Sequence, residues 1–350
     1  MNFDLLVIGN TVAGREAAVA AALRGAHVGL VAEPLAESTT LGRAIHENSL
    51  AFVHETIADL PEFLRVEAQN LRRPGSAVVN VRELRRQLEP ILRLQQQLNE
   101  DQLHAHGIEI LAGRAQLLDS HTVRLLDEEG TELLLDAERI VIATGTEAGE
   151  PDYCEFDGNR VLNIEELWDC EQLPEEVAIV GGSSTGLETA ALLAKLGVRV
   201  TVFDGSHQLP CMAEPRIAAR FATTNAHGVE LRLGEDVIQA TGTSEGARVM
   251  LAGGERVTTG LVLVAVERWG RSEGLGLAAA GVGCDERGRL WCNREGITWT
   301  PHIFAAGDIT GCPITTQASM PAPLPTKSVT SQRGGERRGN RRPARELAGV

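Results

Sequence analysis

An α/β fold with two similar domains is predicted from three observations on this 350-residue sequence. A short apolar run, a glycine-bounded turn, an Ala-rich stretch, a second apolar run and an acidic residue follow one another near the N-terminus. The same order of segments returns about halfway along the chain. A hydrophobic content of 43% and a charged content of 23% are those of a globular protein, and the length allows two hydrophobic cores.

The N-terminal unit has the βαβ order of a Rossmann-like dinucleotide-binding unit. Leu5–Ile8 is apolar and of strand length, and the turn GNTVAG follows it at Gly9–Gly14. Arg15–Leu23 reads as a helix because Ala has the highest helix propensity. His27–Ala32 is a second strand, and it ends at the acid Glu33, 24 residues after Gly9. We expect the turn to bind a pyrophosphate through backbone N–H groups and Glu33 to accept hydrogen bonds from an adenosine ribose.

This first turn departs from the GxGxxG fingerprint, because Thr11 stands at the middle glycine. That glycine lets the backbone approach the pyrophosphate, so a Cβ at this position is expected to crowd the ligand and weaken its binding. Thr11→Gly should then tighten binding. Taken alone, the segment is equally compatible with an ordinary strand–turn–helix in a parallel sheet.

The second unit repeats the pattern. Its strand Val177–Val180 leads into the turn GGSSTG at Gly181–Gly186, and a helix follows over Leu187–Leu196. A further strand, Val198–Phe203, ends at Asp204, 23 residues after Gly181, and the middle glycine is again replaced, here by Ser183. Two such copies in one chain are improbable by chance and indicate two nucleotide sites.

The remaining segments follow the ordinary periodicity rules. Helices are predicted over 46–71, 81–106 and 215–226, with Gly107 ending the second. Strands are predicted over 109–111, 122–126, 132–135, 139–143, 229–233, 237–241, 248–251, 261–266 and 303–305. The stretch 147–173 is expected to be irregular.

Composition excludes several classes of function. A net charge of −15 and only 12 aromatic residues argue against nucleic acid as a partner. We find no apolar run long enough to span a membrane and no signal peptide, so a cytoplasmic protein is expected. The six cysteines form no CxxC motif and are expected to be scattered reduced thiols. The histidines form no metal-binding spacing, so neither a metal site nor a catalytic side chain is predicted.

In order and spacing, four landmarks resemble the flavoprotein disulfide reductases, the pyridine nucleotide–disulfide oxidoreductase family. They are the N-terminal unit, Ala143–Gly145 (ATG), Gly186–Glu188 (GLE) and Ala305–Asp308 (AAGD). The resemblance implies that the first unit binds FAD, that the second binds NAD(P), and that hydride passes from nicotinamide to flavin and on to an acceptor. It also implies that the second domain is inserted in the first: residues 1–147 and 268–320 form the FAD-binding domain, and residues 148–267 the NAD(P)-binding domain.

The site residues follow from matching these landmarks one by one. Those expected to contact FAD are Gly9, Thr11, Gly14, Glu33, Ala115, Thr144, Gly145, Gly307 and Asp308. Those expected to contact NAD(P) are Gly181, Ser183, Gly186, Glu188 and Asp204. Each motif alone also has a purely structural interpretation. Thr144 and Gly145 could form a turn that ends a strand, Asp308 could be a helix N-cap, and Glu188 could be a solvated acid of a helix.

Within the family, Asp157–Val161 and Ile110–Val123 look most like soluble pyridine nucleotide transhydrogenases, with dihydrolipoamide dehydrogenase as the alternative. Aligning 45–48 on the reductase motif IPSK places Thr39 and Ala44 at the two redox cysteines, and neither can form a disulfide. Asn48 replaces the Lys that pairs in the family with the glutamate matched by Glu188. A third possibility is a degenerate chain that binds nucleotide poorly and catalyses nothing.

A preference for NAD(H) over NADP(H) is expected from the second unit. Asp204 is followed by Gly205-Ser206-His207, without Arg or Lys. A 2′-phosphate would therefore meet a carboxylate and be repelled. A transhydrogenase must use both nucleotides, so this expectation weighs against that assignment.

The C-terminal segment 321–350 has a different composition. It holds seven basic and two acidic residues, four prolines, four glycines and no aromatic residue. Such a segment is expected to be disordered. Nothing in it resembles the interface domain that follows the GD motif in the family and forms its homodimer. The expectation is therefore a monomeric or loosely associated chain with little turnover.

Overall fold

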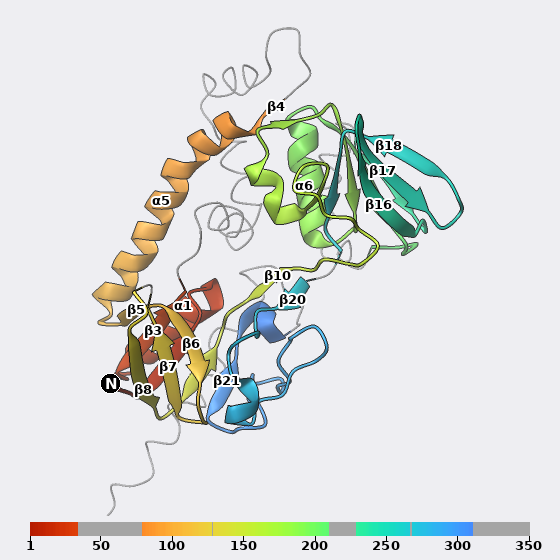
Figure 1. Cartoon of the computed structure of the whole chain (residues 1–350). Helices are drawn as coiled ribbons and strands as arrows, with labels where there is room; N and C mark the ends of the chain where they lie inside the picture. Colours follow the sequence, from red (N-terminus) through yellow and green to blue (C-terminus); the bar gives the residue numbers. More distant parts are fainter. Residues whose placement is uncertain (34–78, 128, 210–228, 267, 311–350) are drawn as a thin grey trace, which may run out of the picture.

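The computed structural model describes residues 1–33, 79–127, 129–209, 229–266 and 268–310. The predicted helices over 46–71 and 215–226, the positions Thr39, Ala44 and Asn48, and the segment 321–350 lie outside the described residues. The described chain has a mixed α/β fold with two parallel five-stranded sheets (Figure 1).

The first parallel sheet has the strand order β21-β9-β2-β3-β5. Its strands are β2 (Leu5–Ile8), β3 (Val28–Ala32), β5 (Glu109–Ala112), β9 (Ile140–Ile142) and β21 (Ile303–Ala305). All four residues of β2 are buried, as a central strand covered on both faces requires. Helix α1 (Val12–Ala22) packs on one face through Ala17, Ala18 and Ala21, whose small side chains bring the helix close to the sheet.

The second parallel sheet has the corresponding order β11-β19-β13-β14-β15. Its strands are β11 (Val161–Asn163), β13 (Glu176–Val180), β14 (Arg199–Asp204), β15 (Val229–Leu233) and β19 (Leu261–Val264). Helix α6 (Ser184–Lys195) follows β13 as α1 follows β2. All strands of this sheet lie in the chain between β9 and β21 of the first.

Each parallel sheet has an antiparallel sheet against its other face. The first consists of β1 (Asn2–Phe3), β6 (Arg114–Leu117), β7 (Thr122–Leu126) and β8 (Glu132–Ala137), with β1 parallel to β8. The second consists of β16 (Val237–Thr243), β17 (Gly246–Leu251) and β18 (Arg256–Thr259). Apolar side chains fill both interfaces, for example Leu125 against Ile140 and Val249 against Val262.

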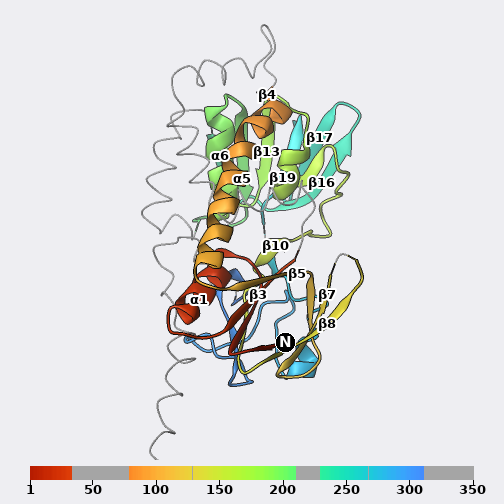
Figure 2. The same cartoon turned by 90° about the vertical axis from the view of Figure 1, so that its left-hand side faces the viewer.

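The 25-residue helix α5 (Val81–Ala105) runs alongside both parallel sheets (Figures 1 and 2). Its N-terminal residues Val81 and Leu84 belong to the core of the second sheet. Leu103, near its other end, is buried in the core of the first. Pro90 is accommodated inside the helix, which continues to Ala105 as predicted.

Short elements complete the described chain. They are β4 (Val79–Asn80), β10 (Thr146–Ala148), η1 (Ile164–Asp169), β12 (Gln172–Leu173), β20 (Arg268–Gly270), η4 (Leu277–Ala280) and η5 (Gly307–Thr310). None of the helices in the described ranges is both long and apolar enough to cross a membrane.

The expectation that 147–173 is irregular was wrong, because this stretch contains β10, β11, η1 and β12. The strands are only two or three residues long, too short for a periodic signal. β11 nevertheless joins the second sheet, where Val161 pairs with Val262 in parallel register. Five further strands, β1, β4, β6, β18 and β20, were also missed.

Candidate functional site

The turn between β2 and α1 is held by two glycines in very close contact. Gly9 has φ +112°, and a Cβ on it would lie 2.3 Å from the carbonyl oxygen of Ala143 at the end of β9. A Cβ on Gly14 would lie 2.1 Å from the Gly9 carbonyl oxygen. Neither position has room for a side chain, so both glycines are needed to pack the first turn of α1 against the sheet.

Thr11 has a role that the sequence did not reveal. Its Oγ1 donates a 2.8 Å hydrogen bond to the carbonyl of Ala143 and accepts a 3.2 Å bond from the N–H of Gly14. Thr11 is therefore the N-cap of α1, and the residue is 9% exposed. The cap explains why α1 begins at Val12, three residues before the predicted start. Thr11→Gly would remove this cap and would therefore destabilise the start of α1. The expected gain in ligand affinity stays a prediction, and the loss of the cap would oppose it.

The turn between β13 and α6 has the same construction. A Cβ on Gly181 would lie 2.7 Å from the carbonyl oxygen of Ala265, and one on Gly186 would lie 2.3 Å from the Gly181 carbonyl oxygen. Ser183 Oγ donates a 2.7 Å bond to Ala265 and accepts a 3.2 Å bond from the Gly186 N–H. The duplication seen in the sequence thus extends to individual hydrogen bonds.

The N-termini of α1 and α6 carry no acidic residue in the first turn. Two other helices differ: α5 has Glu83 and η1 has Glu165 and Glu166 in their first turns. Acids are normally favourable there because the helix dipole places partial positive charge at the N-terminus. Their absence from α1 and α6 leaves these two ends suited to an external anion such as a phosphate.

The acids at the ends of the second strands are held differently in the two units. Glu33, which directly follows β3, forms a 2.9 Å ion pair with Nε of Arg114, the residue before Ala115. Asp204, the last residue of β14, accepts a 2.7 Å bond from the Gly182 N–H and a 2.8 Å bond from the Ser206 N–H. Each acid lies at the carboxyl edge of its sheet, where a ribose is expected.

The structure brings the remaining landmarks of the first unit to the same edge. Gly145, with φ +74°, lies close to the Thr11 side chain. Thr144 Oγ1 donates a 2.7 Å bond to the carbonyl of Arg271. A Cβ on Gly307 would lie 2.8 Å from Cβ of Ala13, so η5, with Asp308, lies against the first turn of α1. In the second unit, Glu188 is placed in α6 one turn beyond Ser184.

Two residues of the first turn were not singled out from the sequence. Arg15 Nη1 donates a 2.7 Å bond to the carbonyl of Asn10, which places a guanidinium over the turn. Asn10 Oδ1 is buried and has no hydrogen-bond partner in the part of the chain that the structure describes. A basic residue directly after the third glycine was the signal available in the sequence.

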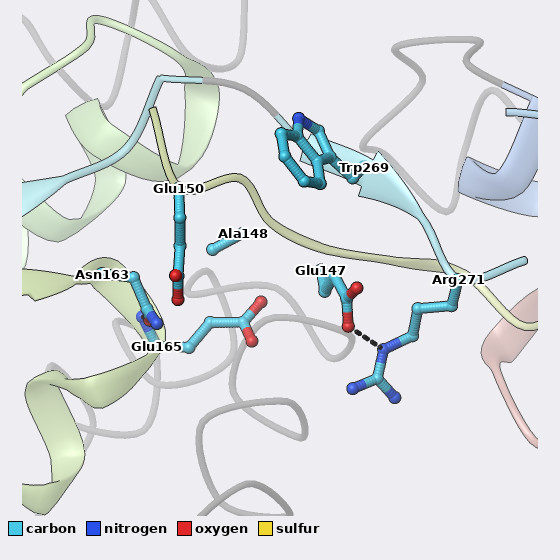
Figure 3. Close-up of a pocket in the computed structure, with 7 residues that line it drawn as sticks. All are labelled: Glu147, Ala148, Glu150, Asn163, Glu165, Trp269 and Arg271. Atoms are coloured by element: carbon cyan, nitrogen blue, oxygen red, sulfur yellow. Dashed lines mark hydrogen bonds and ion pairs between the residues drawn. The ribbon is translucent and has the colours of Figure 1, made fainter. Parts of the chain in front are cut away.

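A cavity of about 350 Å³ lies between the strands that connect the two sheets (Figure 3). Its lining residues come from β10, β20 and the chain around η1: Glu147, Ala148, Glu150, Asn163, Glu165, Trp269 and Arg271. Figure 3 shows three carboxylates pointing into the space below Ala148, with Glu147 paired to Arg271 at 3.2 Å. Glu165 also forms a 2.9 Å pair with Arg268. The Arg271 N–H donates to the carbonyl of Gly145, so the cavity adjoins the first turn.

None of the described cysteines forms a disulfide. Burial raises the pKa of Cys154 to about 12 and that of Cys170 to about 11, so these two thiols have little reactivity at neutral pH. Cys211 and Cys312 lie outside the described residues. Among the described residues, no group of three or more His, Cys, Asp or Glu side chains could hold a metal ion.

Comparisons with known proteins match this geometry. A sequence model described as pyridine nucleotide-disulphide oxidoreductase matches residues 3–325. A soluble pyridine nucleotide transhydrogenase of Mycobacterium bovis is 28% identical over 327 residues, which cover 91% of this chain and 68% of the relative. A dihydrolipoyl dehydrogenase of Chlamydia muridarum is 29% identical over 313 residues, covering 88% and 66% respectively.

Among solved structures, LpdA of Mycobacterium tuberculosis matches with a TM-score of 0.71 at 24% identity. The match covers 92% of this chain and 71% of LpdA. At this identity the likeness concerns the fold alone.

Proposed function

The chain belongs to the pyridine nucleotide-disulphide oxidoreductase family, and from this premise we propose that it binds FAD in its first unit and NAD(P)H in its second. The observation that carries the proposal is the duplicated glycine turn with its hydroxyl N-cap, at Thr11 and again at Ser183. We place the FAD-binding domain at residues 1–147 and 268–320 and the inserted NAD(P)-binding domain at 148–267. The position of the second sheet in the chain, between β9 and β21, supports these boundaries.

FAD would be held by groups that meet at the carboxyl edge of the first sheet. The backbone of the Gly9–Gly14 turn would bind the diphosphate, and Glu33 the adenosine ribose. Ala115 would meet the adenine, and Thr144, Gly145, Gly307 and Asp308 would lie along the rest of the cofactor. The chemistry that FAD supplies when bound is reversible acceptance of hydride from a nicotinamide.

Two features of the described residues support the fit of a dinucleotide to the first turn. The first turn of α1 holds no acid that would repel a diphosphate. Asn10 Oδ1 is a buried acceptor that has no partner among the described residues, as expected of an atom that meets a ligand. Thr11 is compatible with binding because its hydroxyl is directed to Ala143 within the protein.

The second unit would bind NAD(P) through Gly181, Ser183, Gly186, Glu188 and Asp204. The described residues around Asp204 favour NAD(H). Arg232, on the neighbouring strand β15, is the nearby cation, and it is paired with Glu235 and with Glu255, each at 2.6 Å. Among the described residues, a 2′-phosphate at Asp204 would therefore meet negative charge without a matching cation.

A transhydrogenase type of activity is the more specific proposal, with dihydrolipoyl dehydrogenase activity as the alternative. The relatives include proteins with both names. The sequence alignment puts Thr39 and Ala44 where a redox disulfide would need two cysteines, and this favours direct exchange between nicotinamides. Preference for NAD(H) counts against it, because transhydrogenation uses both nucleotides.

The test is to give FAD-loaded protein NADH together with either an oxidised nicotinamide analogue of distinct absorbance or lipoamide. We expect reduction of the analogue and no reduction of lipoamide. Reduction of lipoamide alone would replace the transhydrogenase proposal by the alternative. A protein that binds FAD but oxidises no NADH in either assay would support the third possibility, a degenerate chain that catalyses nothing.

A further inference from the structure

The second sheet orders the parts of a bound dinucleotide along its carboxyl edge. Its strands lie in the order β14, β13, β19 and β11, and the residues paired across their carboxyl ends are Phe203, Val180, Val264 and Asn163. Asp204 is the last residue of β14, and the turn Gly181–Gly186 follows β13. A dinucleotide with its ribose at Asp204 and its diphosphate at this turn therefore continues past β19 toward the end of β11.

The cavity shown in Figure 3 lies at that end of the row. Asn163, the last residue of β11, is one of its lining residues. Arg271 also lines it, and the Arg271 N–H donates to the Gly145 carbonyl of the first unit. A volume of about 350 Å³ is in the range of small-molecule sites. The cavity is therefore placed to receive the nicotinamide end of a dinucleotide held by the second unit.

Negative charge exceeds positive charge around this cavity. Three carboxylates line it. Two of them are neutralised by ion pairs, Glu147 with Arg271 at 3.2 Å and Glu165 with Arg268 at 2.9 Å. Glu150, the third, is exposed and has no hydrogen bond or ion pair to another described residue. The lining residues and their partners therefore leave one uncompensated negative charge for a ligand.

Two further lining residues suit a planar ring that carries an amide. Asn163 Oδ1 accepts bonds from the N–H groups of Glu165 and Glu166, at 2.9 and 3.1 Å. Its Nδ2 donates to no other described residue and remains for a ligand. Trp269, which is 44% exposed, contributes an indole, and an indole attracts a cationic ring. A pyridinium with a carboxamide, the oxidised form of nicotinamide, has the charge, the shape and the acceptor that these groups match.

We propose that the cavity distinguishes the two redox states of the nicotinamide ring, and that Glu150 sets this preference. The oxidised ring is a cation and the reduced ring is neutral, while the rest of the dinucleotide is the same. The uncompensated carboxylate therefore makes NAD⁺ the tighter ligand. Loss of hydride turns the neutral ring into this cation, so the same charge favours hydride donation by the bound nucleotide over the reverse. This inference rests on the proposed function, because it needs a nicotinamide dinucleotide in the second unit.

The test compares the binding of NAD⁺ with that of 1,4,5,6-tetrahydro-NAD, whose ring is neutral and cannot donate hydride. Titration calorimetry on the FAD-loaded chain gives both dissociation constants without reducing the flavin. We expect the unchanged chain to bind NAD⁺ about 5-fold more tightly at low salt, the effect of one partly exposed charge contact. Glu150→Gln should remove this difference, Glu150→Lys should reverse it, and added salt should diminish it in the unchanged chain.

Glu286 provides the matched control, because it is an exposed glutamate between η4 and β21 that does not line the cavity. Glu286→Gln and Glu286→Lys should retain the preference of the unchanged chain. The ratio of the two dissociation constants separates charge recognition from a structural role, since a damaged site would weaken both ligands alike. An equal ratio in the Glu150 and Glu286 variants would overturn the inference while the proposed function stands. If neither nucleotide binds the unchanged chain, the proposed function fails, and the inference fails with it.

Discussion

At the scale of single residues, the hydroxyl groups of Thr11 and Ser183 have the same structural role in the two units. Thr11 and Ser183 each stand where the dinucleotide fingerprint has its middle glycine, and each caps a helix while bonding to the end of the neighbouring strand. In the sequence, each hydroxyl residue was interpreted only as a replaced glycine. In the structure, each hydroxyl makes two hydrogen bonds that hold the turn. The third glycine of each turn then packs beneath a helix start that the hydroxyl has already fixed.

Removing the Thr11 hydroxyl while keeping its shape should destabilise the protein. Thr11→Val leaves the Gly14 N–H without its cap and the Ala143 carbonyl without this donor, so we expect the free energy of unfolding to fall by about 1–3 kcal/mol. Denaturant titration measures this change. Thr122→Val is the control, since the contacts of its hydroxyl are exposed: one of 3.3 Å to Asp136 and one to the Asp119 carboxylate. An equal loss in both variants would refute the role of the cap.

Asp204 should set the choice of nicotinamide nucleotide. Its carboxylate is fixed by the N–H groups of Gly182 and Ser206, so it is held at the proposed ribose position before any ligand binds. We expect NADH to bind more tightly than NADPH, and Asp204→Asn to narrow the difference by removing the negative charge. Dissociation constants for both nucleotides and both proteins provide the measurement. Tighter binding of NADPH by the unchanged chain would contradict the prediction.

His302, just before β21, should make stability fall in mild acid. Burial, His121 and Arg139 lower the pKa of His302, and its ring stacks on that of His121 with centroids 4.0 Å apart. Because its pKa is lowered, His302 is protonated at a lower pH in the folded state than in the unfolded chain. The stability it contributes is therefore complete above about pH 6.5 and is lost as the pH falls toward the folded pKa.

The measurement is the free energy of unfolding between about pH 5 and pH 8, with and without His302→Gln. The variant should lose less stability on acidification than the unchanged chain. His27 is the control of opposite sign, because its hydrogen bond to Glu109 raises the pKa of its imidazole. Its contribution is present below about pH 6.5 and is lost as the pH rises through the folded pKa. An unchanged pH profile in His302→Gln would exclude this role.

At the scale of elements, the strand–turn–helix unit depends on close contact at its third glycine. Gly14→Ala would place a Cβ 2.1 Å from the Gly9 carbonyl oxygen, so α1 must move away from β2. We expect a loss of about 1–3 kcal/mol in the free energy of unfolding, together with weaker FAD binding. Gly253→Ala is the control, since a Cβ there meets nothing within 4 Å. Unchanged stability and FAD binding in Gly14→Ala would show that the turn is less tightly packed than described.

The elements that the sequence predicted well are those with long or repeated signals. The strands β2 and β15 agree with prediction at both ends, and α5 agrees to within one residue. β11 could not be predicted, because three residues carry no period and its place in the sheet depends on pairing with β19, about 100 residues later in the chain. The starts of α1 and α6 were placed too late because the capping hydroxyls were interpreted only as replaced glycines.

At the scale of the whole molecule, several parts of the candidate site were expected to meet because the family resemblance assigned them all to FAD. The turn Gly9–Gly14, the segment Thr144–Gly145 and the GD motif at Gly307 lie together in the structure, at the edge where the parallel strands β2, β9 and β21 end. The Glu33–Arg114 ion pair, the Asn10–Arg15 contact and the cavity beside Gly145 were not expected. Each depends on the direction of side chains and on contacts between residues distant in the sequence, which the sequence pattern does not predict.

The helix α5 adds a constraint that belongs to no single sheet. Its N-terminal Leu84 is buried in the core of the second sheet and its Leu103 in that of the first. One continuous helix therefore reaches the core of one parallel sheet at each of its ends (Figure 2). The sequence indicated the helix and the apolar face at its N-terminal end. The second core at the other end follows only from the tertiary structure.

We propose that this chain is a flavoprotein that is reduced by a nicotinamide nucleotide. The most direct measurement is the visible absorbance of the protein after incubation with FAD and removal of the excess, followed by anaerobic addition of NADH. We expect a retained flavin absorbance band that is lost when NADH is added. A protein that emerges colourless after exposure to excess FAD would contradict it.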